Sequence, residues 1–160
     1  MSRYMTLNSW LDMAYAYAQK TSGCRKVAVG SLIEKDNTII AMGANRAIPN
    51  LCKTQRGCLR VEKYGEDSKI HRNPEDCRAI HSEIDAICAA AMEGHSVKDA
   101  VIFVTRYPCE SCAKAIAAAG IKQIFYGGTA NISEETARIL DNAHIECIWV
   151  EGWKEDNSDR

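Results

Sequence analysis

The sequence predicts an α/β fold in which one sheet is covered by helices and entered through a β-hairpin. Helical and strand-like patterns alternate along the second half of the chain, and two apolar runs near the N-terminus flank a short polar turn. Hydrophobic residues make up 46% of the 160 positions, enough for one continuous core. The predicted order is α-β-β-α-β-α-β-α-β, which places five strands in one sheet. We expect one domain over residues 1–150 and a polar tail over 151–160.

The first two elements are an amphipathic helix and a hairpin. Apolar residues recur at helical spacing across residues 6–20, and Asn8 or Ser9 is a candidate N-cap. Residues 26–34 and 38–43 are apolar runs on either side of a polar turn, which is the pattern of a β-hairpin.

The remaining elements alternate regularly after a long irregular stretch. Helices are expected to stop near Gly94 and Gly120, because glycine ends helices readily. The predicted elements are a helix over 82–93, a strand over 100–105, a helix over 110–119, a strand over 121–126, a helix over 133–142 capped by Ser133, and a strand over 145–150.

Residues 46–76 form the irregular stretch, a predicted long loop. A loop of this length is unusual unless it is functional or held in place by another group. Residues 46–72 carry seven basic and three acidic side chains, a local charge of +4. This basic segment suits a small anionic ligand such as a phosphate, and a solvated loop with scattered charge is the alternative.

Charge and cysteine content restrict the class of protein. The net charge of −1 does not suit a protein that coats nucleic acid, so we expect no nucleic-acid partner. No apolar run approaches the ~20 residues of a membrane span, and the first ten residues lack the apolar core of a signal peptide. We therefore expect a cytoplasmic protein without a membrane partner. In a reducing compartment its eight cysteines favour metal binding or catalysis over disulfides.

Two short motifs carry the chemistry, and both lie at predicted helix starts. His81 precedes Glu83 by two positions, and Pro108 opens a Pro-Cys-x-x-Cys string that contains Cys109 and Cys112. Cysteines three apart face the same side of a first helical turn. The positive end of the helix dipole favours their thiolate form. Zinc prefers imidazole and thiolate ligands, and a catalytic site keeps its fourth position for water. His81 is the expected third protein ligand.

The spacing of Glu83 sets a geometric condition on this site. In a regular helix, residues two apart point to nearly opposite sides, so Glu83 faces the metal only if His81 lies at the helix cap. The combination of H-x-E with P-C-x-x-C is the signature of zinc deaminases. The alternative is a closed, non-catalytic zinc site with Cys88 as fourth ligand, although Cys88 lies on an apolar helix face and is expected in the core.

Three segments resemble one known family. VAVGSLIEKDNTIIAMGAN, HSEIDAI and VTRYPCESCAKAIAAAGIKQIFY are similar to the opening hairpin, the catalytic helix start and the metal-binding segment of the cytidine and deoxycytidylate deaminase superfamily. The resemblance is closest to the deoxycytidylate deaminases and covers about residues 5 to 150. It implies a cytidine-deaminase-like three-layer α-β-α sandwich with a mixed five-stranded sheet.

The resemblance also implies roles for individual residues. His81, Cys109 and Cys112 would bind the catalytic zinc, Glu83 would shuttle protons, and Asn45 would contact substrate. The chain departs from the family pattern at three positions near these motifs: Ala44 stands in place of tyrosine, Ser82 in place of alanine and Asp85 in place of asparagine.

Two arginines are candidates for binding a substrate phosphate. Arg46 adjoins Asn45, and Arg106 lies at the end of the strand before the Pro-Cys-x-x-Cys string. An ordinary strand-end arginine is the alternative interpretation of Arg106.

A second set of metal-binding residues lies around the long loop. Four of the five residues Cys24, Cys52, Cys58, His71 and Cys77 could form a closed tetrahedral zinc site that holds this loop. The resemblance to phage deoxycytidylate deaminases with a second zinc favours Cys24, Cys52, His71 and Cys77, with Cys58 able to replace any of the last three. Cysteines without metal in a loop that folds unaided are the alternative.

The predicted function is zinc-dependent hydrolytic deamination of a cytosine nucleotide, from dCMP to dUMP with release of ammonia. The alternatives are deamination of a nucleoside, of another aminated heterocycle or of a tRNA adenosine, and a non-catalytic zinc-binding module. The alanine-rich helix over 113–119 permits close approach of another helix, and in this family such helices meet across subunits, so we expect a homo-oligomer such as a hexamer.

Overall fold

A computed structural model describes residues 5–24, 27–47, 58–65, 77–128 and 132–155. The elements follow in the order α1 (Leu7–Thr21), β1 (Gly30–Lys35), β2 (Thr38–Ala44), β3 (Arg46–Ala47), α2 (Leu59–Tyr64), β4 (Ala79–Ile80), α3 (Ser82–Met92), β5 (Val101–Val104), α4 (Glu110–Ala118), β6 (Gln123–Tyr126), α5 (Glu134–Asn142) and β7 (Glu146–Trp149). None of these described helices is long and apolar enough to cross a membrane.

The main sheet is mixed, as predicted. Its five strands lie in the order β2-β1-β5-β6-β7. β1 pairs antiparallel with β2 and β5, and β6 pairs parallel with β5 and β7. Asp36 and Asn37 both adopt positive φ in the two-residue turn between β1 and β2, the conformation that matches the twist of a tight hairpin.

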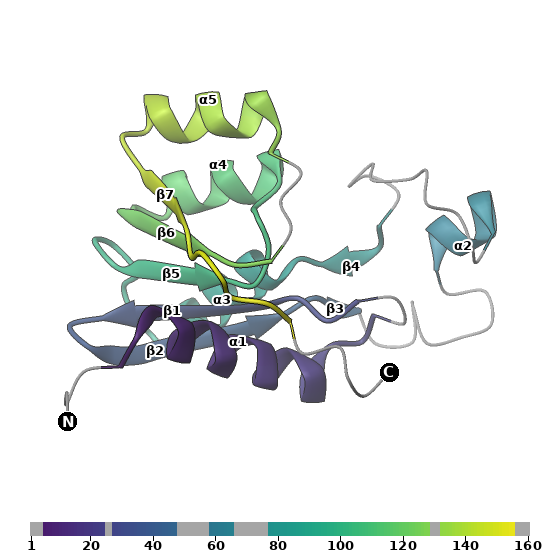
Figure 1. Cartoon of the computed structure of the whole chain (residues 1–160), viewed down its shortest axis with the longest axis horizontal. Helices are drawn as coiled ribbons and strands as arrows, with labels where there is room; N and C mark the ends of the chain where they lie inside the picture. The colour runs from purple at the N-terminus through teal and green to yellow at the C-terminus, as the bar shows by residue number, and fades with distance from the viewer. Residues whose placement is uncertain (1–4, 25–26, 48–57, 66–76, 129–131, 156–160) are drawn as a thin grey trace.

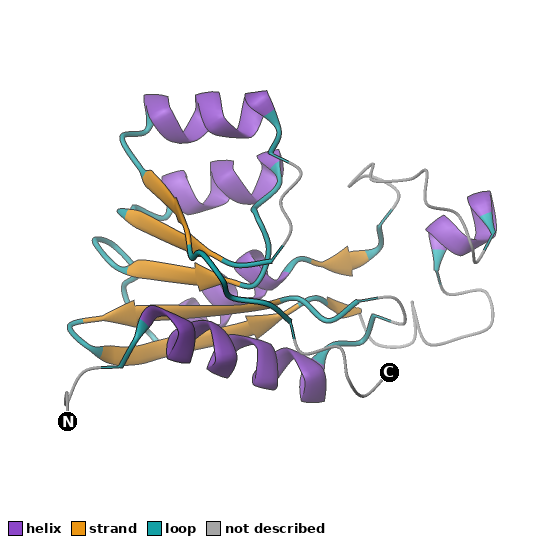
Figure 2. Ribbon diagram, viewed as in Figure 1, coloured by secondary structure: helices purple, strands orange, loops and turns teal. Residues whose placement is uncertain are grey.

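Helices cover both faces of this sheet, which confirms the three-layer α/β architecture (Figures 1 and 2). α1 lies on one face, where its side chains pack with Leu32 and Phe103. α3, α4 and α5 contribute side chains to a second core on the opposite face, together with Ile33 and Ile102. Because neighbouring residues of a strand point to opposite faces, β1 and β5 serve both cores.

Two glycines allow helices to lie directly on the hairpin strands. A Cβ atom at Gly30 would collide with the carbonyl group of Ala14 in α1. A Cβ atom at Gly43 would collide with the backbone of Ser82 and Ala86 in α3. The backbones of α1 and α3 therefore lie against β1 and β2 without an intervening side chain.

The first helix begins at a different cap from the predicted one. Thr6 is the N-cap of α1, and its Oγ1 accepts a hydrogen bond of 3.2 Å from the Ser9 backbone N–H. Asn8 and Ser9 lie inside the first turn, because Thr6 already holds the extended conformation of a cap. Ser133 caps α5 as predicted, with its Oγ accepting from the Thr136 N–H at 3.3 Å.

The stretch over 46–76 contains short regular elements that its sequence did not predict. Arg46 and Ala47 pair antiparallel with Ile80 and Ala79 in a two-stranded sheet. α2 follows later, and it contains no buried residue. The pairing ties the chain that leaves β2 to the residues immediately before His81.

The described part of the predicted polar tail carries a core residue. Trp153 is only 5% exposed and belongs to the cluster on the α1 face. Its Nε1 donates a hydrogen bond of 2.8 Å to the Asp12 carboxylate, and its ring contacts Tyr15 edge-on. The chain after β7 therefore returns across the α1 face.

Candidate active site

The two sequence motifs meet where the N-termini of α3 and α4 adjoin. His81 is the N-cap of α3, with φ −70° and ψ 151°, and Cys109 is the N-cap of α4. His81 therefore lies at the helix cap, which is the position that its spacing from Glu83 requires if both side chains are to face one metal site. α4 follows β5 after a short turn, so the site lies at the carboxyl end of a parallel strand, where ligand sites of α/β sheets usually form.

Local pairing holds both motifs in place. β4 ends one residue before His81 and is paired with β3. The Thr105 side chain accepts a hydrogen bond of 3.0 Å from the Gly30 N–H, which ties the end of β5 to the start of β1. Pro108 is fully buried just before the first turn of α4, where its missing N–H costs little.

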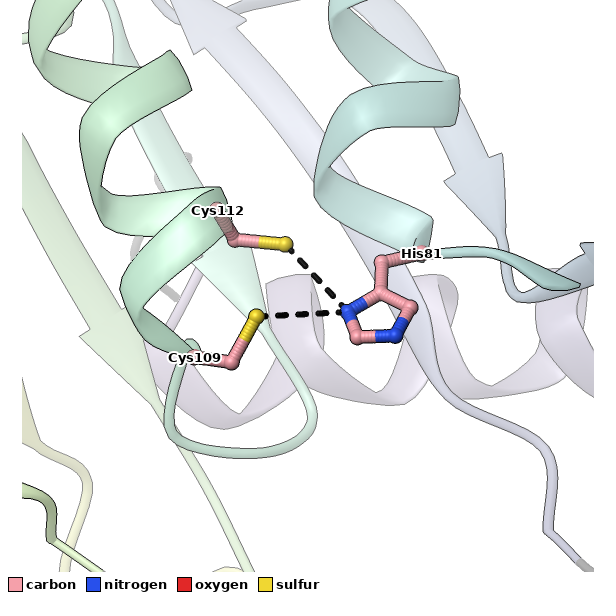
Figure 3. Close-up of side chains that lie close together, drawn as sticks. All are labelled: His81, Cys109 and Cys112. Carbon is pink, nitrogen blue, oxygen red and sulfur yellow. Dashed lines mark hydrogen bonds between the residues drawn. The ribbon is translucent and has the colours of Figure 1, made fainter. Parts of the chain in front are cut away.

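The imidazole and the two sulfurs converge on one point (Figure 3). Nδ1 of His81 lies 3.4 Å from Sγ of Cys109 and 3.5 Å from Sγ of Cys112. All three ligand atoms lie within 4.8 Å of one another, and no other described residues form such a cluster. One nitrogen and two sulfurs form a donor set that zinc prefers, with a fourth position left for water. The residues present therefore fit a catalytic zinc ion.

Hydrogen bonds and burial shift the pKa values of Cys109, Cys112 and His81 in different directions. The hydrogen bond from Cys112 is the main cause that lowers the pKa of Cys109 to about 4. The same contact, with burial, raises the pKa of Cys112. Hydrogen bonds with Cys109 and Cys77 raise the pKa of His81 to about 10. Because zinc requires thiolates and a neutral imidazole, its binding releases protons from Cys112 and His81.

Glu83 lines the same cavity as His81 and Cys109, two of the three metal-binding candidates. The cavity has a volume of about 270 Å³, and its wall includes His81, Glu83 and Cys109. Glu83 is 4% exposed, and burial raises the pKa of its carboxyl group. A carboxyl group with a raised pKa exchanges protons near neutral pH more readily than an exposed one.

Cys88 lies neither in the core, as the sequence predicted, nor in the metal-binding cluster. Its side chain is exposed on α3, so the expectation that it packs in the core is wrong. The helix turns it away from the apolar face that packs on the sheet. Cys88 is not among the residues that cluster with His81, so it does not close the metal site.

Asn45 lines the cavity, but its amide group is engaged by the protein. Oδ1 accepts hydrogen bonds from the Val29 N–H at 2.8 Å and the Ser22 hydroxyl at 2.6 Å. Nδ2 donates to the Val27 carbonyl at 2.8 Å. Asn45 therefore shapes the cavity wall by joining the end of β2 to the segments before β1.

The two candidate phosphate-binding arginines have different positions. Arg106 lines the catalytic cavity, and its Nε and Nη2 donate to both carboxylate oxygens of Glu155 at 3.0 and 3.1 Å. Arg46 is absent from the cavity wall, and its Nη2 lies 2.6 Å from Oδ1 of Asp85. The second oxygen of Asp85 accepts from the Ala44 N–H at 3.1 Å, so this carboxylate joins α3 to the end of β2.

The proposed second zinc site falls only partly within the described residues. Cys52 and His71 lie outside them. Cys24 and Cys77 both line the catalytic cavity, and a hydrogen bond with His81 lowers the pKa of Cys77. Cys58 is the N-cap residue of α2 and is absent from the cavity wall.

Four residues near the site were not predicted from the sequence. Ser31 and Ser82 form a hydrogen-bonded chain that ends on Glu83, Tyr107 lines the cavity, and Glu155 binds Arg106. Ser31 could have been noticed in the sequence, because it is a polar residue directly before the apolar pair Leu32 and Ile33 of the predicted strand. Ser82 could also have been noticed, because the family pattern carries alanine at this position. No sequence feature pointed to Glu155, since its partner Arg106 is distant in sequence.

A layered α/β fold that gathers one imidazole and two thiols at adjoining helix N-termini, beside a buried glutamate, defines the class of zinc-dependent deaminases. Comparisons with known proteins agree with this class. The model of the MafB19-like deaminase family matches residues 5–151. The deoxycytidylate deaminase of Enterobacteria phage T4 is 32% identical, over 91% of this chain and 90% of that protein.

Two further relatives extend the comparison. ComE operon protein 2 of Bacillus subtilis is 34% identical over 81% of this chain, and the match spans 64% of that longer protein. The dCMP deaminase of cyanophage S-TIM5, solved in complex with dCMP and dUMP, superposes with a TM-score of 0.68. It is 23% identical and covers 89% of this chain and 94% of its own, so it supports the fold. The chain belongs to the MafB19-like deaminase family, within the cytidine and deoxycytidylate deaminase superfamily, as its motifs predicted.

Proposed function

We propose that this chain deaminates dCMP to dUMP and releases ammonia. The observation that carries the proposal is the convergence of His81, Cys109 and Cys112, two of which, His81 and Cys109, line one cavity together with the buried Glu83. The relationship to the phage T4 deoxycytidylate deaminase supports the choice of substrate. The atoms balance as cytosine plus water giving uracil plus ammonia.

Each residue has a defined task in this reaction. His81, Cys109 and Cys112 would hold the zinc ion, which when bound makes a water molecule acidic enough to act as nucleophile at neutral pH. The Glu83 carboxylate removes a proton from the water that attacks C4 of the pyrimidine and delivers a proton to N3. Glu83 then takes the second proton from the oxygen now bonded to C4 and transfers it to the exocyclic amine, the C4–N bond breaks, and ammonia leaves as the C4 carbonyl forms. Burial of Glu83 keeps bulk water away from these transfers.

Substrate contacts follow from the cavity wall. Arg106 is the proposed partner of the substrate phosphate, because it lines the cavity and its side chain is 41% exposed. A guanidinium group has five N–H donors, and two of these bind Glu155. Asn45 and Tyr107 would contact the nucleoside from the same wall. Arg46 remains a weaker candidate because it binds Asp85 outside this wall.

A substrate series tests the proposal. Ammonia release is measured with dCMP, CMP, deoxycytidine, guanine and a short RNA as substrates, for the wild-type chain and for Arg106→Gln. We expect the highest kcat/KM with dCMP. Arg106→Gln should raise KM for dCMP without changing the kinetics of deoxycytidine. A preference for deoxycytidine or for the RNA would reject the dCMP assignment, and ammonia from no substrate would identify a non-catalytic zinc module.

A second, structural zinc is a separate proposal. Cys24, Cys52, His71 and Cys77 would hold it, with Cys58 as the alternative ligand. The support is chemical: cysteine and histidine are the ligands of closed zinc sites, and such a site would fasten the long loop predicted from the sequence. Two zinc ions per purified chain would support this site, and one would exclude it. Cys58→Ser then identifies whether Cys58 is a ligand.

We also infer that the chain forms a homo-oligomer in the cytoplasm. The support is the family resemblance and the small side chains of α4, which permit a close approach of a second helix. Large apolar side chains are also exposed on described elements, including Met92 at the end of α3 and Trp149 on the edge strand β7. Light scattering coupled to size exclusion measures the mass directly. A mass of 17.7 kDa would refute the inference.

A further inference from the structure

Two serine hydroxyls form a short hydrogen-bonded chain that ends on the Glu83 carboxylate. Oγ of Ser31 lies 2.7 Å from Oγ of Ser82, and the Ser82 hydroxyl donates a hydrogen bond of 3.1 Å to Oε2 of Glu83. Both serines are fully buried. Their hydroxyl groups therefore depend on each other and on Glu83, because a buried polar group without a partner is costly.

The donor order in this chain follows from proton counting. Each hydroxyl carries one proton and can accept further hydrogen bonds. An ionised Glu83 only accepts, so Ser82 must donate to it, and Ser31 must then donate to Ser82. When Glu83 holds a proton, Ser82 can accept from Glu83 and donate to Ser31. The same two contacts therefore persist through both states that the proposed reaction requires of Glu83.

The fold brings the two serines together from different layers. Ser31 lies on β1 and pairs across the hairpin with Gly43. Gly43 touches the backbone of Ser82, because it has no side chain to separate α3 from β2. Ser82 is the first residue of α3, between His81 and Glu83. A hydroxyl on the sheet thus fixes a hydroxyl at the start of the helix that carries the catalytic candidates.

Ser82 is the side-chain donor suited to hold Glu83 during the reaction. Cys112 also lies within hydrogen-bonding reach of Glu83. As a zinc ligand, however, the Cys112 sulfur is a thiolate that has no proton to donate. The Ser82 hydroxyl keeps its proton under the same conditions.

We propose that Ser82 is a positioning residue that holds the Glu83 carboxylate toward the cavity, and that Ser31 fixes Ser82 in the orientation this requires. The proposal rests on the proposed function of Glu83 as the proton shuttle. Alanine, the residue that the related family pattern carries at this position, provides no such contact. In this chain, the orientation of the Glu83 carboxylate would therefore be fixed partly by Ser31 of the β1–β2 hairpin and not by α3 alone.

A double-mutant cycle separates positioning from stability. Ser82→Ala, Ser31→Ala and the double variant are compared for kcat, KM, zinc content and thermal midpoint with dCMP. Ser82→Ala leaves the buried Ser31 hydroxyl without its partner, so we expect a loss of ~2–4 °C in Tm. Ser31→Ala should lose less Tm, because the Ser82 hydroxyl keeps its hydrogen bond to Glu83. The double variant also removes the unpaired Ser31 hydroxyl, so its Tm should be higher than that of Ser82→Ala.

The kinetic outcome should not follow the stability outcome. Ser82→Ala and the double variant should both lose roughly 10-fold to 100-fold in kcat, the range for a hydrogen bond to a charged group, with little change in KM or zinc content. Ser31→Ala should lose less, because Ser82 can still donate to Glu83. Thr136→Val is the matched control, since this buried hydroxyl in α5 is not part of the cavity wall and its loss should leave kcat unchanged.

The results that would overturn the proposal are distinct. Recovery of kcat together with Tm in the double variant would show that the two serines act only on stability. A wild-type kcat in Ser82→Ala would remove the positioning role directly. Failure of the proposed function is recognised separately, because the wild-type chain would then release no ammonia from any substrate, and the positioning role would be refuted with it.

Discussion

Replacing Gly43 with alanine should disable the site while leaving the fold in place. The new Cβ atom would lie 2.9 Å from the Cα of Ala86 and closer still to the Ala86 nitrogen and the Ser82 carbonyl oxygen. An ordinary contact begins near 3.4 Å, and all three obstructing atoms belong to the backbone of α3. No side chain can rotate to relieve the collision, so the N-terminal turn of α3 must move away from β2.

The expected loss follows from the size of that movement. A shift on the order of 1 Å at Ser82 carries its neighbours His81 and Glu83 with it, and a misplacement of that size can cost ~100-fold in rate. Overpacking of this kind costs about 1–3 kcal/mol of folding stability, which a domain of 5–15 kcal/mol survives. We therefore expect a folded variant with a lower Tm and a kcat reduced by about two orders of magnitude.

Gly94→Ala provides the matched control at the opposite end of α3. Gly94 has φ +76° and open space around its Cα, so alanine there costs ~1–2 kcal/mol through left-handed backbone strain without displacing the helix start. Steady-state kinetics with dCMP and thermal unfolding are measured for both variants. The reasoning is refuted if Gly43→Ala retains a wild-type kcat, or if both variants lose kcat equally.

Three further outcomes are expected. Glu83→Gln should retain its zinc, measured by metal analysis, and lose at least ~100-fold in kcat, because it removes the general acid–base group; near-normal turnover would exclude that role. Chelation should abolish ammonia release, and added zinc should restore it in the wild type but not in Cys112→Ser, which lacks one thiolate ligand; activity in the chelated protein would contradict a zinc mechanism. Trp153→Ala should cost about 3–5 kcal/mol in denaturant unfolding, because it empties a buried site and leaves Asp12 without its indole donor; an unchanged midpoint would show that the C-terminal segment does not contribute to the core.

The buried position of Glu83 sets the pKa of its carboxyl group, which the proposed proton transfers depend on. A carboxyl group in a dry cavity is costly to ionise, which is why burial raises its pKa. The hydrogen bond from the Glu83 backbone N–H, the charge of His81 and, as the smallest effect, the hydrogen bond from Ser82 act in the opposite direction and favour the charged form. A raised pKa suits a group that must both accept and donate a proton in each cycle.

Most of the fold could be predicted from the sequence because its signals are local. The apolar periods of α1, α3 and α5 and the short apolar runs of β5 and β6 lie within single elements, where spacing and length together distinguish helix from strand. The metal-binding candidates were equally accessible, since Cys109 and Cys112 share one helical turn and His81 belongs to a short motif. The N-cap of α1 at Thr6 was missed because several neighbouring polar residues can cap a helix equally well.

The contacts between distant segments required the tertiary structure. The sequence indicated a histidine and two cysteines as candidate zinc ligands, but not that the N-termini of α3 and α4 bring their ligand atoms within 4.8 Å of one another. It contained no trace of the pairing of Arg106 with Glu155, or of the burial of Trp153. It also did not indicate that Ser31 and Ser82 form a hydrogen-bonded chain that ends on Glu83. Local periodicity specifies which residues face inward, whereas the packing of helices on the sheet decides which inward-facing residues meet.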